Sequence, residues 1–455
     1  MVQLLYLACA AAFVIGLKRL SSPRTARSGN IVAGLGMLAA VVITLLHQDI
    51  LNWGAIAVAA AVGAAVGVVW ARQVAMTAMP QMVAALNGFG GAASALVAGA
   101  ELAARDPGAT RLDIQVTILL ALAIGAVTFS GSVIAFGKLQ GLVSGSAIAY
   151  RAQAAVSVLV TLVAVGAAVA ALATGEVFGF WVVGGVALVI GVLMVLPVGG
   201  ADMPVVVSLL NSFSGLAAAG TGFAIENSAL IIGGALVGSA GFILTVQMCE
   251  AMNRSLMNVL LGAFTSAQAA TATAEAGDTS VRAATAEDVA IALAYAERVL
   301  IVPGYGLAVA QAQHDVQKLA RELEARGVEV GYAIHPVAGR MPGHMNVLLA
   351  EADVAYEKLL DMDDANQIAA RTDVMLVLGA NDVVNPAARD DPSSPIYGMP
   401  IIEVDRAKTV VVVKRSLAPG YAGIDNPLFY FDQTMMFFGD AKEALQRVTE
   451  SLSLV

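Results

Sequence analysis

Residues 78–91, A-M-P-Q-M-V-A-A-L-N-G-F-G-G, return as a close copy in residues 201–215, A-D-M-P-V-V-V-S-L-L-N-S-F-S-G. Both follow the pattern M-P-x-x-V-x-x-L-N-x-F-x-G, at a shift of 124 residues. Each copy carries one asparagine, Asn87 or Asn211, two helical turns after its proline and on the same face. Such apolar runs with a single uncharged polar group are typical of membrane helices. The repeat therefore predicts a membrane part with two related helices.

Composition separates this membrane part from a soluble one. The chain has 455 residues, of which 58% are hydrophobic and 13% charged, whereas soluble domains are about 25% charged. Residues 285–455 alone hold 14 Lys and Arg against 24 Asp and Glu. We therefore expect a membrane domain over residues 1–262, a linker over 263–284 and an acidic soluble domain over 285–455. The acidic balance argues against a nucleic-acid partner.

Apolar runs of about 20 residues predict nine membrane spans. These candidates are residues 2–17, 31–47, 53–71, 80–104, 114–136, 153–173, 178–196, 203–224 and 228–250. The spans are dense in Gly, Ala and Ser, which predicts a closely packed helical bundle. Because the first and third spans are short or rich in glycine, the number of membrane spans could differ from nine by one.

Lys and Arg residues set the predicted orientation. Eight follow odd-numbered spans: Lys18, Arg19, Arg24, Arg27, Arg72, Lys138, Arg151 and Arg254. Only Arg105 and Arg111 follow even-numbered spans. The positive-inside rule then predicts an N-terminus outside and a C-terminal domain in the cytoplasm.

The C-terminal third alternates short β-branched runs with helical segments. Residues 298–304 read as a strand, 308–326 as a helix and 328–335 as a second strand, with further strands at 374–379, 401–404 and 409–414. Buried apolar strands that alternate with helices predict a Rossmann-like, doubly wound parallel sheet.

A glycine-rich turn follows the first of these strands. Gly304, Tyr305 and Gly306 lie between strand and helix, which is the context of a dinucleotide-binding fingerprint. Gly304 suits a tight turn, and Gly306 lets the backbone approach a pyrophosphate. Val309 occupies the third position, where Gly or Ala is usual. An accidental match is the alternative.

The second strand ends at A-I-H-P, without the acidic residue that normally holds the ribose of NAD. A later strand instead ends in Lys414, Arg415 and Ser416. Two cations and a hydroxyl suit a 2′-phosphate, which predicts NADP(H) rather than NAD(H). The alternative is a solvated Lys-Arg pair.

Three loops would complete the nucleotide site: residues 335–346, 379–386 and 418–428, the last as a mobile lid. The predicted cofactor-binding residues in these loops are His335, Val337, Ala338, Gly339, Arg340, Met341, Pro342, Gly379, Ala380, Asn381, Asp382, Gly420, Tyr421 and Ala422. No metal is expected, because His335 and His344 lack a third ligand at suitable spacing. Hydride transfer needs no catalytic acid or base from the protein, since the cofactor carries that chemistry.

These stretches resemble the β subunit of proton-translocating NAD(P) transhydrogenase over nearly the whole chain. P-G-Y-G-L-A-V-A-Q-A-Q (303–313), G-A-N-D-V-V-N-P-A-A (379–388) and G-Y-A-G-I-D-N-P-L-F (420–429) are similar to that family's NADP-binding domain, and residues 199–215 are similar to its membrane part. The resemblance implies reversed NADP binding, in agreement with the missing acid and the late Lys414 and Arg415.

It also implies that NADH on a partner α subunit passes hydride to NADP⁺ held here, driven by inward proton movement. The chain contains one dinucleotide fold, so NAD(H) would lie on that partner, which would add membrane helices. A homodimer of the αβ unit in the inner membrane is implied as well. Asp382 becomes a possible coupling residue, and the predicted proton pathway comprises Asn87, Asn211, Asp202 and Ser208.

One departure concerns Asn87, which stands where part of the family carries a membrane histidine. Asparagine does not titrate near neutral pH, so the titrating group would come from a partner's helix, with Asn87 holding water. The alternative is that Asn87 and Asn211 only tie neighbouring helices. At the level of the whole chain, the competing functions are a channel or transporter gated by a nucleotide-sensing domain and a membrane scaffold with a degenerate Rossmann domain.

Overall fold

The computed structural model describes residues 2–20, 22–47, 53–105, 110–145, 147–148, 152–200, 202–261, 281–420 and 422–455. Two compact units make up the chain: Met1–Gly199 with Val205–Thr245, and Gly200–Pro204 with Val246–Val455. Residue 262 and most of the predicted linker, residues 263–280, lie outside the described residues.

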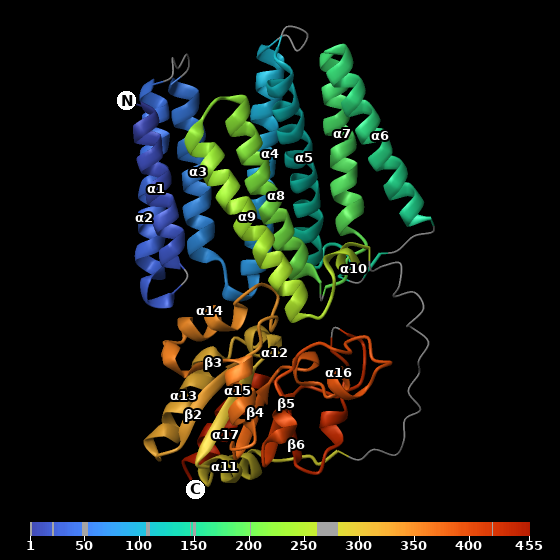
Figure 1. Cartoon of the computed structure of the whole chain (residues 1–455). Coiled ribbons are helices and arrows are strands. Elements are labelled where there is room, and N and C mark those ends of the chain that lie inside the picture. Colours follow the sequence, from blue (N-terminus) through green and yellow to red (C-terminus); the bar gives the residue numbers. More distant parts are fainter. Residues whose placement is uncertain are drawn as a thin grey trace. The chain divides into compact units, whose positions relative to one another are not determined.

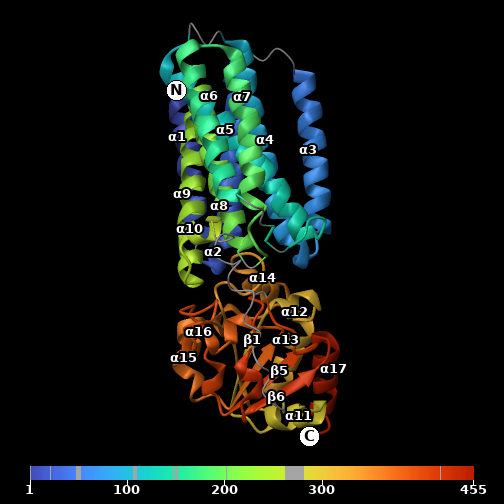
Figure 2. The same ribbon diagram turned by 90° about the vertical axis from the view of Figure 1, so that its right-hand side faces the viewer.

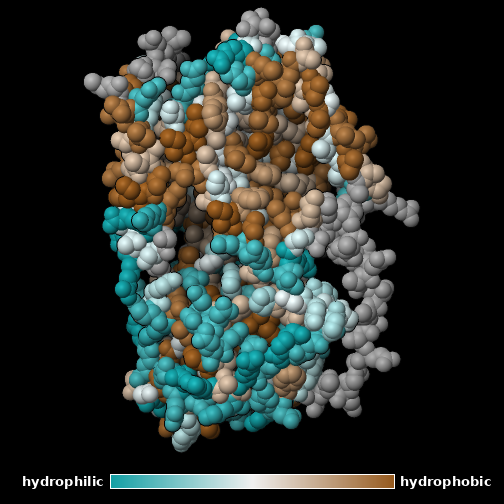
Figure 3. Space-filling view, in the orientation of Figure 1, coloured by the Kyte–Doolittle hydropathy of each residue, from teal (hydrophilic) through white to brown (hydrophobic). Residues whose placement is uncertain are grey.

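The nine predicted spans are confirmed as nine long apolar helices in the described part of the chain (Figure 1). They are α1 (Val2–Leu20), α2 (Pro23–His47), α3 (Trp53–Gln73), α4 (Met79–Ala104), α5 (Leu112–Gln140), α6 (Gln153–Thr174), α7 (Val177–Val195), α8 (Met203–Ala224) and α9 (Ser228–Ala251). Hydrophobic side chains dominate the visible face of these helices in Figure 3, as a lipid-facing surface requires. A short helix, α10 (Leu256–Leu261), follows.

The sequence repeat corresponds to a repeated helix pair. In the first copy, a Cβ added at Gly91 would lie 2.8 Å from the carbonyl oxygen of Gly125, which places α4 directly against the backbone of α5. In the second copy, a Cβ at Gly215 would lie 2.3 Å from the amide nitrogen of Gly238, which places α8 equally close to α9. The glycine that ends both copies of the motif is therefore a point of close contact between each repeat helix and the helix that follows it.

Helix α3 does not follow the predicted close packing. None of its residues is buried, and a Cβ added at Gly63 or Gly67 would meet no atom within 4 Å. Figure 2 shows α3 apart from the other helices. Its small residues therefore do not serve contacts within the described part of this chain.

The C-terminal part contains an all-parallel sheet, as predicted, and this sheet has six strands (Figure 1). The strands are β1 (Arg298–Pro303), β2 (Glu329–Ile334), β3 (Leu359–Asp361), β4 (Val374–Leu378), β5 (Thr409–Lys414) and β6 (Thr434–Phe438). Their order, β3-β2-β1-β4-β5-β6, is that of the doubly wound Rossmann fold. The order reverses between β1 and β4, so loops from their carboxyl ends meet at one edge.

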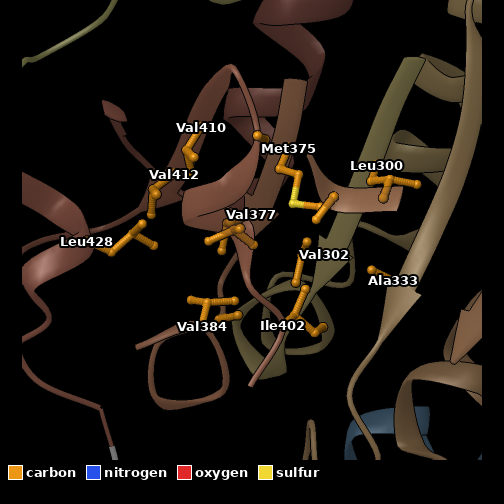
Figure 4. Packing of buried hydrophobic residues seen from close by; sticks show 14 of the residues in the cluster. Leu300, Val302, Ala333, Met375, Val377, Val384, Ile402, Val410, Val412 and Leu428 are labelled. Carbon is orange, nitrogen blue, oxygen red and sulfur yellow. The ribbon is translucent and has the colours of Figure 1, made fainter. Parts of the chain in front are cut away.

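The helices and turns of this part are short. They are α11 (Ala286–Ala294), α12 (Tyr305–Val309), α13 (Gln313–Ala325), α14 (His344–Glu351), α15 (Met362–Ala369), α16 (Ala387–Asp390) and α17 (Ala441–Leu452), with 3₁₀ turns η5 (Tyr356–Lys358), η6 (Asp382–Val384), η7 (Val404–Arg406) and η8 (Pro427–Tyr430). Alternate residues of the central strands form a buried hydrophobic core on one face of the sheet. Leu300, Met375 and Val410 share one row of it (Figure 4).

Three details of the predicted α/β pattern were wrong. Residues 308–326 are two helices, because Gln311 adopts a left-handed backbone (φ 51°) that ends the first. Residues 401–404 form no strand, since the side chain of Asn366 accepts from the Glu403 amide and donates to the Ile401 carbonyl. Strands β3 and β6 were missed: β3 has three residues, and β6 is rich in Met and Phe rather than β-branched residues.

The chain just before α11 joins the last strand. The amide of Ala284 donates to the carbonyl of Met436, and the amide of Met436 donates to the carbonyl of Arg282. Ala283 pairs with Met436 in parallel orientation. The beginning of the α/β part thereby lies along the outer side of β6.

Two adjacent glycines in α9 test the packing of the repeat. A Cβ at Gly234 would lie 2.5 Å from the amide nitrogen of Ala219, whereas one at Gly233 would meet nothing within 4 Å. We expect Gly234→Ala to destabilise the purified chain in detergent by about 1–3 kcal/mol, because a backbone atom cannot yield as a side chain does. Gly233→Ala is the control, and equal thermal unfolding midpoints for both variants would contradict the close contact.

Candidate functional site

The loops after β1 and β4 touch through their backbones. The amide of Gly304 donates to the carbonyl of Leu378 (2.9 Å), and the amide of Gly306 donates to that of Gly379 (2.9 Å). A Cβ at Gly304 would lie 2.4 Å from the Gly379 oxygen, and one at Gly306 would lie 2.7 Å from the Gly379 Cα. Both positions therefore exclude any side chain. The backbone of Gly304 is extended (φ −122°), so steric room rather than a left-handed turn explains this glycine.

The third fingerprint position shows why valine is tolerated there. Val309 is the last residue of the five-residue helix α12 and is 44% exposed. The buried positions of this helix are Leu307 and Ala308. Val309 thus makes no close helix–strand contact that would require glycine.

The loop after β2 is organised by two buried histidines. Nδ1 of His335 accepts from the amide of Val337 (3.2 Å), so its proton lies on Nε2, which donates to the carbonyl of Pro400 (2.8 Å). Burial lowers the pKa of His335 to about 4. Nδ1 of His344 accepts from the amide of Arg340 (3.0 Å), and burial lowers the pKa of His344, with a smaller contribution from Arg340.

This loop meets the glycine turn through Arg340 and Tyr305. The guanidinium carbon of Arg340 lies 4.3 Å from the centre of the Tyr305 ring, a cation–π contact. Gly339 has a left-handed φ of 106°, and a Cβ there would lie 2.5 Å from Nδ1 of His344. Among the remaining predicted residues of the loop, Ala338 is buried, and Val337, Met341 and Pro342 are partly buried.

The loop after β4 contacts the segment after β5. Oδ2 of Asp382 accepts from the amide of Ala422 (3.0 Å), and a Cβ at Gly420 would lie 2.4 Å from Oδ1 of the same carboxylate. Asp382 thus contacts the predicted lid at Gly420 and Ala422. Tyr421, the residue predicted to cover a ligand, lies outside the described residues.

The predicted phosphate-binding cluster stands at the end of β5. Lys414 donates to the carbonyl of Ala418 and lies 5.4 Å from the ring centre of Phe429. Burial lowers its pKa, against the attraction of Asp382 and Asp425. Arg415 and Ser416 are exposed. The amide of Gly379 donates to the carbonyl of Val413, which places the end of β5 beside the β4 loop.

In the membrane helices, the predicted polar residues gather around α8. Nδ2 of Asn87, on α4, donates to the carbonyl of Val207 (3.1 Å), and Ser214 donates to the carbonyl of Asn87 (3.0 Å). Ser208 donates to the carbonyl of Gly241 on α9 (3.2 Å). Asn211 is partly exposed and also lies beside Gly241. The Asn87 contact is of the kind that ties membrane helices.

At the start of α8, Oδ2 of Asp202 forms an ion pair with Nη1 of Arg254 (2.9 Å). The Asp202 side chain is 13% exposed, and its other oxygen has no hydrogen-bond partner in the described part of the chain. The pair joins the chain before α8 to the chain after α9.

The chain is similar to known proteins over nearly its whole length. The family model described as NAD(P) transhydrogenase beta subunit matches residues 2–451. The chain is 48% identical over 455 residues to NAD(P) transhydrogenase subunit beta of Rhodospirillum rubrum, with 98% of each chain covered. The protein of the same name from Rhodospirillum rubrum strain ATCC 11170 shows the same identity and coverage.

The chain belongs to the NAD(P) transhydrogenase beta subunit family. The resemblance noted from the sequence is therefore confirmed. Together with the nine apolar helices, family membership identifies a membrane protein that crosses the bilayer several times.

Sequence reasoning missed two buried asparagines in this member of the family. Asn385 and Asn426 are fully buried between the β4 loop and the lid segment. Each directly precedes a proline, Pro386 or Pro427. Asn-Pro pairs favour turns, so this signal was present in the sequence. Among the described residues, no cluster of three or more metal-ligating side chains occurs.

The neutral His335 gives the protein a predicted pH dependence. Its pKa is about 4 in the fold against 6.5 as a free side chain, so the unfolded chain binds a proton in this window that the folded chain does not. Stability should therefore fall by about 2 kcal/mol between pH 7 and pH 5. His335→Gln can still donate to Pro400 without titrating, and unfolding of both proteins at the two pH values measures the difference. An identical pH slope in wild type and variant would refute this role.

Proposed function

We propose that this chain binds NADP(H), accepts hydride from NADH held on an alpha subunit, and couples the transfer to inward proton translocation. Family membership supports the transhydrogenase assignment. The support for NADP(H) comes from the edge of the sheet where the loops of β1, β2, β4 and β5 converge.

One observation carries the nucleotide assignment. Lys414 ends the strand that adjoins the β4 loop. Strand β2 ends at Ile334 and is followed by His335, with no carboxylate to bind a ribose 2′-hydroxyl. A cation at this edge attracts a phosphorylated ribose through charge-assisted hydrogen bonds. Arg415 and Ser416 follow directly and add a guanidinium and a hydroxyl. NADP(H) matches this set better than NAD(H) does.

The chain's own residues would hold and orient the nucleotide. The glycine turn, in which Gly304 and Gly306 close against Gly379, would hold the pyrophosphate beside α12, and Arg340 and Tyr305 would form an adjoining wall. The nicotinamide supplies the hydride chemistry when bound. Asp382 would link nucleotide occupancy to Ala422, since its carboxylate accepts from the Ala422 amide.

The partner follows from the number of nucleotide folds. The described residues contain one parallel sheet and one glycine turn of this type. A second dinucleotide, NAD(H), therefore requires another chain, which we assign to the alpha subunit. We further propose a homodimer of the αβ unit in the inner membrane, with the N-terminus outside and the α/β domain in the cytoplasm.

For proton movement, we propose a path along α8. Asn87, Ser208 and Asn211 supply uncharged polar groups there. The Asp202–Arg254 ion pair lies at the start of α8, which in this proposal is the cytoplasmic end. An amide both donates and accepts hydrogen bonds, so it can hold water without a charge in the membrane. Since neither asparagine titrates, the titrating group would lie on a membrane helix of the partner.

The nucleotide assignment is tested by removing both cations. Lys414→Ala with Arg415→Ala should weaken NADPH binding by about tenfold or more and leave NADH binding nearly unchanged, because charged hydrogen bonds to the 2′-phosphate are lost. Lys408→Ala, at the opposite end of β5 and paired with Asp373, is the matched control. Binding is measured by nucleotide fluorescence, and equal losses for both nucleotides would disprove the 2′-phosphate role.

The proton path is tested in vesicles that contain all subunits. Asn211→Leu should lower proton-coupled turnover by about tenfold or more while NADP(H) still binds, since leucine removes the polar group and excludes water. Thr161→Leu on α6, whose hydroxyl bonds its own helix at Ser157, controls for an added leucine. Wild-type coupled rates in Asn211→Leu would leave Asn211 with a structural role alone.

A further inference from the structure

Two buried asparagines clasp the β4 loop to the segment that precedes η8. Nδ2 of Asn385 donates to the carbonyl of Asp425 (3.0 Å), and its Oδ1 accepts from the amide of Ala387 (3.0 Å). Nδ2 of Asn426 donates in the opposite direction, to both oxygens of Asn381. Both side chains are fully buried. These hydrogen bonds therefore fix the position of Asn381 from inside the protein.

The hydrogen bonds of Asn426 also fix which way its amide faces. The amide N–H of Leu428 donates to Oδ1 of Asn426 (3.0 Å), and a backbone N–H can only donate. The NH₂ group of Asn426 must therefore lie on the other side. There it donates to the main-chain oxygen of Asn381 (3.1 Å), which can only accept.

The orientation of the Asn426 amide also determines which way the side chain of Asn381 faces. The same NH₂ group of Asn426 lies 3.0 Å from Oδ1 of Asn381. Because a donor faces it, Asn381 must present its oxygen to Asn426 and turn its own NH₂ group away. The Leu428 amide thus sets the orientation of Asn381 through Asn426.

The NH₂ group of Asn381 is buried and has no hydrogen-bond partner within the described part of the chain. A buried donor left without an acceptor is unfavourable, and such groups call for an explanation. Asn381 directly follows Ala380 in the loop at the carboxyl edge of the sheet, beside Asp382. A bound molecule with an exposed oxygen would satisfy this donor.

We infer that Asn426 is a positioning residue that holds the amide of Asn381 with its N–H groups directed to an oxygen of the bound nucleotide. This inference rests on the proposed NADP(H) site. Asn426 itself is buried behind Asn381 and acts through it. Asp382 and Asp425 adjoin these two asparagines in the sequence, and each attracts the cation of Lys414.

Asn426→Asp is the decisive variant. One carboxylate oxygen still accepts from the Leu428 amide, but the other faces Asn381 as an acceptor. Asn381 then turns its NH₂ group toward residue 426 and its oxygen toward the nucleotide. We expect NADPH to bind the purified full-length chain at least about tenfold more weakly, because a donor has become an acceptor.

Asn366→Asp is the matched control, because Asn366 also bridges a backbone carbonyl and a backbone amide, those of Ile401 and Glu403. It lies on α15, outside the nucleotide loops. NADPH affinity in this variant should stay within about twofold of wild type.

The pH profile separates positioning from general damage. A protonated carboxyl at residue 426 can donate to Asn381 again, and burial raises the pKa of such a group. The ratio of variant to wild-type affinity should therefore recover between pH 8 and about pH 6. Asp382, Lys414 and Asp425 are present in both proteins, so the ratio removes their own titration.

Asn426→Asp binding NADPH as tightly as wild type, or more weakly by the same factor at every pH, would overturn the inference. Should that variant not fold, Asn381→Asp replaces the free N–H groups by an oxygen while still accepting from Asn426, and the same loss is expected. Unchanged affinity in Asn381→Asp would overturn the inference as well. Absence of NADPH binding in the wild-type chain would instead refute the proposed function.

Discussion

The α/β part depends on one backbone contact, the approach of Gly304 and Gly306 to Gly379. Where the strand order of such a sheet reverses, the connections after the two neighbouring strands leave toward opposite faces, which leaves a crevice between their loops. Here the crevice is closed by main-chain hydrogen bonds, and a Cβ at either glycine would overlap Gly379 or Ala380. The β4 loop then continues to the end of β5 through Gly379 and Val413. Displacement of this contact would separate the cation of Lys414 from the glycine turn.

The membrane helices also depend on direct backbone contact at glycines, although lipid rather than water surrounds them. Lipid offers no hydrophobic drive between helices, so close packing supplies the attraction. Gly91 and Gly215 give α4 and α8 that proximity to α5 and α9. Polar side chains then connect the two repeats, as Asn87 and Ser214 do between α4 and α8. In both parts of the protein, glycines thus mark places where two backbone segments lie in direct contact.

Much of the fold could be predicted because its signals are local. Apolar runs mark all nine spans, and strand–turn–helix alternation marks β1, β2, β4 and β5. The errors arose where distant residues decide. Asn366 takes the backbone groups that would have made residues 401–404 a strand, and β6 depends on its pairing with β5.

The local geometry of the candidate site was predictable to a similar extent, while its role in binding stays a proposal. Gly304, Gly306 and Lys414 could be named because turn and strand-end chemistry is written in adjacent residues. The orientation of Asn381 could not, since Asn426 and Leu428 determine it from more than 40 positions away. The helix pairs joined through Gly91 and Gly215 were likewise visible as a repeat, but their contacts with Gly125 and Gly238 were not.

The pairing of residues 282–284 with Met436 has a consequence for solubility. Unpaired edge strands invite other chains to add to a sheet, and natural proteins shorten or cover them. In this sheet one margin, β3, has only three residues, and the other, β6, is covered at its centre by the incoming chain. An all-parallel sheet rich in valine is thus protected from intermolecular aggregation on both sides.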